Sequence, residues 1–166
     1  MQRIITFFLA AVMCFALVGC GSSNNQIKDE PKDEPYRKVT YGMSFEEVKE
    51  TEKELGGKFI EEDDTRILYS ANVEGETVRI VYRFNNGKLE YYNIIASPDH
   101  GTKDYLQFHD DLLKVLDKSY STLEKDNETY WYNSYEMVGK TFVDEKYVGK
   151  SVIFMFQLKE NTETSN

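Results

Sequence analysis

VRIVYRFNNGKLEYYNIIA, residues 78–96, is the stretch that decides how this chain folds. Two runs rich in β-branched and aromatic residues, 78–84 and 89–96, flank the turn sequence Asn85-Asn86-Gly87-Lys88. Asn-Gly is the strongest short signal for a two-residue hairpin turn, because both residues tolerate a positive φ. The stretch therefore predicts two antiparallel strands joined by a tight turn.

A two-residue turn also predicts the register of this hairpin. It places Arg83 opposite Glu90 and Tyr82 opposite Tyr91, and both pairs are favourable across strands. Side chains then alternate between the two faces of the hairpin. One face carries Ile80, Tyr82, Phe84, Leu89, Tyr91 and Ile95. The other face carries Arg79, Val81, Arg83, Tyr92 and Ile94.

Two helices are predicted on either side of this hairpin, over residues 44–55 and 104–123. Ser44 and Glu47 have the spacing of a capping box, and Gly56-Gly57 ends the first helix. The second helix is amphipathic. Its apolar stripe, which we expect to face the core, is made of Tyr105, Phe108, Leu112, Leu113, Leu116 and Tyr120.

Further strands are predicted at 65–73, 129–137, 140–147 and 151–159, so that a helix followed by three strands occurs twice. The two units cover residues 41–97 and 102–159, and matching positions are about 62 residues apart. The predicted fold class is α+β, with tandem helix-plus-three-strand units that form an antiparallel sheet and place both helices on one face. The domain spans residues 36–160.

The N-terminus has the pattern of a secretory leader. One basic residue precedes IITFFLAAVMCFALV, residues 4–18, an apolar run of signal-peptide length that is short for a membrane span. A retained signal anchor is the alternative. The following Leu17-Val18-Gly19-Cys20 resembles the lipobox of bacterial lipoproteins. The resemblance implies a signal peptide over residues 1–19 and a diacylglycerol thioether on Cys20 that anchors the chain to a membrane.

Residues 20–35 predict a flexible tether. Lys-Asp-Glu-Pro occurs twice in succession at 28–35, and mixed charge with proline favours an extended, solvated chain of at most roughly 50 Å. The tail, residues 161–166, is predicted to be disordered. The expected location is therefore outside the cytoplasm, on the cell membrane or in the outer envelope.

Composition and motifs exclude several classes of function. The formal net charge is −9, which disfavours nucleic acid because a phosphate backbone needs a basic surface. The two histidines, His100 and His109, lack the spacing of a metal site, and the acidic run 61–64 lacks the glycine of a calcium loop. We therefore predict no metal, no cofactor and no enzyme, although a pair of catalytic carboxylates leaves no local signature.

Aromatic residues are the one surplus in this sequence, at 14%. Tyr130, Trp131 and Tyr132 follow one another, so both faces of their predicted strand carry rings. Helices cover only one face of a sheet, and tyrosine and tryptophan are favoured at protein interfaces. The candidate binding face on the side without helices is made of Arg79, Val81, Arg83, Tyr92, Ile94 and Trp131.

Residues 41–48, YGMSFEEV, resemble the opening of the SmpA/OmlA small lipoproteins and of units in the β-lactamase inhibitory protein-like fold. The resemblance implies a binding protein without catalysis. We expect a membrane-anchored bacterial lipoprotein whose extracytoplasmic domain binds another envelope protein. A lipoprotein that binds a small ligand or a glycan is the alternative.

Overall fold

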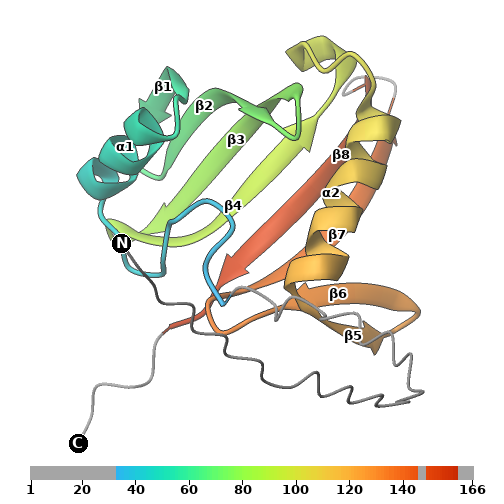
Figure 1. The fold of residues 1–166 in the computed structure, drawn as a ribbon. Helices are drawn as coiled ribbons and strands as arrows, with labels where there is room; N and C mark the ends of the chain where they lie inside the picture. The colour runs from blue at the N-terminus through green and yellow to red at the C-terminus, as the bar shows by residue number, and fades with distance from the viewer. Residues whose placement is uncertain (1–32, 146–148, 161–166) are drawn as a thin grey trace, which may run out of the picture.

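The computed structural model describes residues 33–145 and 149–160. Eight antiparallel strands form one sheet in the order β1-β2-β3-β4-β8-β7-β6-β5 (Figure 1). The predicted signal peptide, Cys20, most of the tether and the tail lie outside the described residues. The strands are β1 (Lys58–Asp63), β2 (Arg66–Val73), β3 (Glu76–Asn85), β4 (Lys88–Ala96), β5 (Ser121–Lys125), β6 (Glu128–Tyr132), β7 (Glu136–Glu145) and β8 (Gly149–Leu158).

The predicted tandem helix-plus-three-strand units are wrong, because four strands follow each helix. Helix α1 (Phe45–Glu54) precedes β1–β4, and helix α2 (Tyr105–Ser119) precedes β5–β8. The 3-10 helix η1 (Pro98–His100) lies between these two parts, and the pairing of β4 with β8 makes them one sheet. The chain is thus dominated by a single sheet with two short helices.

The sequence pattern missed β1 and β5 because they are the two edge strands of the sheet. Every residue in both is exposed, so neither strand shows the alternation of apolar and polar residues that marks a half-buried strand. β5 begins where the second helix was predicted to continue, and α2 ends at Ser119 instead. The predicted strand 129–137 is two strands, separated by a turn in which the Asn133 side chain accepts the backbone N–H groups of Tyr135 and Glu136.

The hairpin of β3 and β4 has the predicted turn but a different register. Asn86 and Gly87 both have positive φ, and Phe84 pairs with Leu89. Arg83 then pairs with Tyr91 instead of Glu90, so β4 contains one extra residue. Such a β-bulge reverses the face of every residue that follows it. Tyr92 and Ile94 therefore share a face with Tyr82 and Ile80, and not with Arg79 and Arg83.

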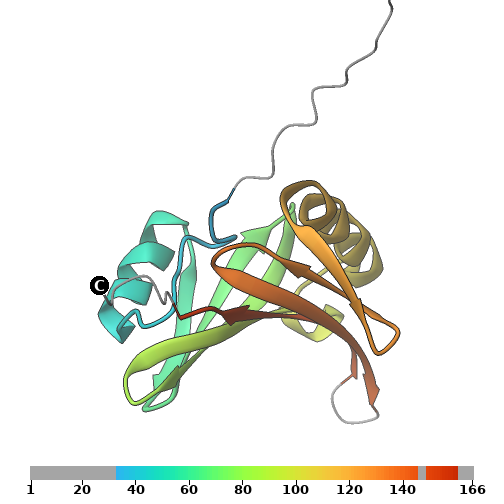
Figure 2. The same cartoon turned by 90° about the horizontal axis from the view of Figure 1, so that it is seen from below.

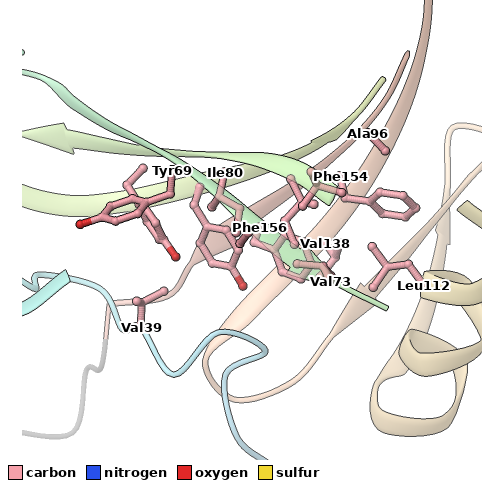
Figure 3. Packing of buried hydrophobic residues seen from close by; sticks show 14 of the residues in the cluster. Val39, Tyr69, Val73, Ile80, Ala96, Leu112, Val138, Phe154 and Phe156 are labelled. Carbon is pink, nitrogen blue, oxygen red and sulfur yellow. The ribbon is translucent and has the colours of Figure 1, made fainter. Parts of the chain in front are cut away.

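Both helices cover the same face of the sheet (Figure 2). Phe45 of α1 stacks on Phe84 of β3, and Phe108 of α2 meets Phe154 of β8 edge to face. Figure 3 shows Leu112 of α2 and Val39 directed toward the buried side chains of the sheet. One hydrophobic core thus fills the space between the sheet and these elements.

Residues 33–43, which we call the strap, cover the sheet between the two helices (Figure 2). Val39 is fully buried, and Tyr36 stacks on Phe156 of β8 with ring centroids 5.4 Å apart. At the end of the strap, the Gly42 N–H donates to Leu89 O and the Leu89 N–H donates to Met43 O. The strap is therefore the third element, with α1 and α2, that packs on this face of the sheet.

Candidate functional site

The structure divides the predicted binding residues between the two faces of the sheet. Tyr92, Ile94 and Trp131 are buried on the helix side. The Trp131 indole N–H donates to Asp117 Oδ1 at 2.6 Å, and Lys140 Nζ lies 5.4 Å from its ring centroid. These three residues belong to the core and its border, so their assignment to an exposed face is wrong.

Arg79, Val81 and Arg83 lie on the opposite face, where none of the described elements covers the sheet (Figures 1 and 2). Val81 is buried among its neighbours, whereas both arginines are half-buried. The register of β3, β4 and β8 brings further residues to this side. We define the helix-free face by Arg79, Arg83, Tyr91, Asn93, Ile95, Ile153 and Met155.

One exposed apolar side chain and three half-buried ones lie at the centre of this face. Met155 is 45% exposed although β8 is a central strand, and its neighbours Ile153, Ile95 and Tyr91 are only half-buried. None of these four residues was among the predicted binding residues. The bulge at Glu90 is the reason for Tyr91 and Ile95, because no sequence signal distinguished the bulged register from the regular one.

Two buried carboxylates lie on the helix side, and both hold the strap. Glu52 of α1 is fully buried and receives both Arg37 Nη2 contacts, at 2.7 and 2.9 Å, and Arg37 Nε at 2.9 Å. The Tyr82 hydroxyl donates to Glu52 Oε1 and accepts from Arg37 Nε at 3.2 Å. The charge of Glu52 is thus compensated by a guanidinium in bidentate geometry.

Glu136 at the start of β7 is the second buried carboxylate, and its hydrogen-bond partners are all uncharged. Oε1 accepts from the Tyr36 backbone N–H at 2.6 Å and from the Tyr120 hydroxyl at 2.5 Å. Oε2 accepts from the Tyr92 hydroxyl at 3.1 Å. Burial raises the pKa of Glu136 above its ordinary value, although these hydrogen bonds oppose the shift.

These carboxylates stabilise the fold and do not form an open catalytic pair. Both residues are fully covered, and each carboxylate oxygen already accepts a hydrogen bond.

A hollow of about 550 Å³ lies elsewhere in the molecule, away from the two buried carboxylates. It is open to solvent and is lined by Phe45, Glu46, Lys49, Glu62, Asp63 and Asp64. Within it Lys49 Nζ bridges Glu46 at 3.1 Å and Glu62 at 2.7 Å.

In the part of the chain that the structure describes, neither histidine lies in a group of side chains that could bind a metal ion together. His109 contacts Asp110 at 2.9 Å and Lys140 at 3.5 Å, and its ring packs on Phe142. His100 lies in η1. Among the described residues, no three histidine, cysteine, aspartate or glutamate side chains are grouped so that they could hold a metal ion.

No protein-family model, curated protein or solved structure matches this chain. The resemblance of residues 41–48 to the SmpA/OmlA lipoproteins and to the β-lactamase inhibitory protein-like fold therefore stays a prediction. Within residues 33–145 and 149–160, no helix has the length and apolar character needed to cross a membrane.

Arg37→Met is expected to lower the free energy of unfolding by about 3–5 kcal/mol, because it leaves the Glu52 carboxylate buried without its cation. The double variant Arg37→Met/Glu52→Met removes both charges and should recover most of that loss. Urea denaturation of the three proteins measures both effects. A double variant no more stable than Arg37→Met would contradict the conclusion that Arg37 compensates the buried charge of Glu52.

Glu136→Gln is expected to change how stability depends on pH. The folded chain has the higher Glu136 pKa, so it binds the proton more tightly than the unfolded chain does. This contribution favours folding at low pH and is lost as pH rises from the ordinary pKa of 4.5 through the raised value. The wild-type free energy of unfolding should therefore fall relative to Glu136→Gln over that interval, measured by urea denaturation at successive pH values. Free energies of unfolding that change in parallel with pH in the two proteins would disprove the raised pKa of Glu136.

Proposed function

We propose that this chain is a lipid-anchored extracytoplasmic domain of a bacterial envelope, and that its helix-free face binds another envelope protein without catalysis. The observation that carries the proposal is the asymmetry of the sheet. α1, α2 and the strap cover one face, whereas the exposed Met155 and half-buried apolar side chains occupy central strands of the other.

The composition of the helix-free face supports a protein partner. Tyrosine, methionine and arginine are enriched at the centres of protein interfaces, and all three occur together on β3, β4 and β8. An apolar side chain such as Met155 gains little from folding while it remains exposed, but gains burial when a partner covers it. The face extends over neighbouring strands, which suits a broad contact with another protein.

A glycan or small-ligand module, the alternative, needs a slot in which aromatic rings enclose the ligand. The hollow at α1 and β1 has one ring, Phe45, and its other lining residues are charged. The geometry of the described residues therefore supports protein binding better than it supports ligand binding.

The lipid anchor rests on residues 17–20 and on the apolar run before them. A chain processed at this site is expected to begin at Cys20 and to carry the additional mass of a diacylglycerol thioether, measured by mass spectrometry of the membrane fraction. Cys20→Ala should abolish the added mass and release the chain from the membrane. Cys14→Ala is the matched control and should change neither property. An unmodified Cys20 in the membrane fraction would contradict the anchor.

Protein binding is tested with a photocrosslinking benzophenone residue placed at position 155 or at position 106 in intact cells. Met155 lies on the helix-free face, whereas Leu106 is 53% exposed on α2. We expect one protein adduct from position 155, none of the same mass from position 106, and loss of the adduct with Cys20→Ala. A correctly anchored chain that yields no protein adduct from position 155 would overturn the proposed function.

A further inference from the structure

We infer that the partner presents carboxylates to Arg79 and Arg83, so that the helix-free face binds an acidic protein surface. This inference rests on the proposed function and specifies the chemistry of its partner. It follows from how the arginines of this chain are paired, from their neighbours in the sheet, and from the geometry of β3.

Two of the four described arginines have carboxylate partners and two do not. Arg37 pairs with Glu52 at 2.7 Å, and Arg66 pairs with Asp63 at 2.7 Å and Glu61 at 3.0 Å. Among the side chains described at 33–143 and 149–160, no carboxylate lies within ion-pair distance of Arg79 or Arg83. The chain has 29 acidic and 20 basic residues, so acids to pair with them are abundant.

The cross-strand neighbours of these arginines add no compensating charge. Arg79 lies opposite Ser70 on β2 and Ile95 on β4. Arg83 lies opposite Tyr91 on β4 and Arg66 on β2. Like charges that face each other across strands are destabilising. Arg66 is neutralised by the two acids of β1, which leaves the positive charge of Arg83 for an external anion.

The spacing of Arg79 and Arg83 suits recognition of carboxylates on a protein. Alternate residues of a strand point to the same face, so positions 79 and 83 lie four residues, about 13 Å, apart on one side of β3. Each guanidinium is planar and offers a fork of N–H donors that matches a carboxylate. Ile95 and Tyr91, the neighbours of these arginines on β4, provide apolar surface. When a partner covers this surface, water is excluded from the two contacts between arginine and carboxylate.

An acidic protein fits this face better than an anionic membrane does. Binding to an anionic bilayer needs a cluster of basic residues, and two separated arginines on this face do not form one. Two arginines separated along one strand instead suit a surface that places carboxylates at defined positions. Local complementarity of this kind fixes the register of two proteins.

The test uses the anchored full-length chain with the benzophenone residue at position 155. Arg79→Glu/Arg83→Glu reverses the two charges of the face. Lys53→Glu/Lys103→Glu makes the same change in net charge at two exposed lysines outside it. We expect about a tenfold or larger loss of the protein adduct in the first variant and little loss in the second. The crosslinked peptide, identified by mass spectrometry, should carry aspartate or glutamate.

Folding of each variant is checked by circular dichroism and urea denaturation, and Arg79→Gln/Arg83→Gln replaces the charge-reversed variant if that one does not fold. An adduct of unchanged yield, or one on a peptide without acidic residues, would overturn the inference and leave the proposed function standing. An adduct to lipid would assign the face to the membrane and overturn both. If the chain with Arg79 and Arg83 unchanged gives no adduct from position 155, the proposed function is overturned as well.

Discussion

The contact on which the helix side of this fold depends is the buried ion pair of Arg37 and Glu52, with the Tyr82 hydroxyl beside it. It joins three elements that are distant in sequence, because Arg37 belongs to the strap, Glu52 to α1 and Tyr82 to β3. Two short helices cannot cover an eight-stranded sheet, and the strap fills the space between them. Charged groups in such a position are tolerated only when each is paired and hydrogen-bonded. The pair therefore determines where the chain crosses the core.

Glu136 plays a comparable role at Tyr36, the residue of the strap next to Arg37, with a different balance of forces. Its partners are a backbone N–H and two tyrosine hydroxyls, so it lacks the cation that Glu52 has. The ring centroids of Tyr82 and Tyr92 lie 5.5 Å apart, so the two rings connect the hydrogen-bonded cluster of Glu52 with that of Glu136. The many tyrosines of this sequence thus serve partly as hydroxyl donors to buried carboxylates. Composition alone suggested aromatic packing and a binding face, and gave no sign of this third use.

Local signals in the sequence were reliable where the physics is local. The Asn86-Gly87 turn needs only positive φ, and the capping box of Ser44 and Glu47 needs only a spacing of three, so both are present. Edge strands β1 and β5 carry no periodic burial and could not be recognised from periodicity. The extra residue at Glu90 depends on tertiary packing, and it moved Tyr92 and Ile94 into the core while bringing Tyr91 and Ile95 to the helix-free face.

The entry point of the tether adds a constraint on how the domain meets a partner. Asp33 accepts from the Ser134 hydroxyl and backbone N–H, and the Glu34 carbonyl accepts from Asn133, so the first described residues bind the loop between β6 and β7. From there the strap runs along the helix side (Figure 2). A chain that is held from this side leaves Arg79, Arg83 and Met155 on the side away from its attachment. An anchor at Cys20 would then restrict the distance of the domain from the membrane without occupying the face that we propose for binding.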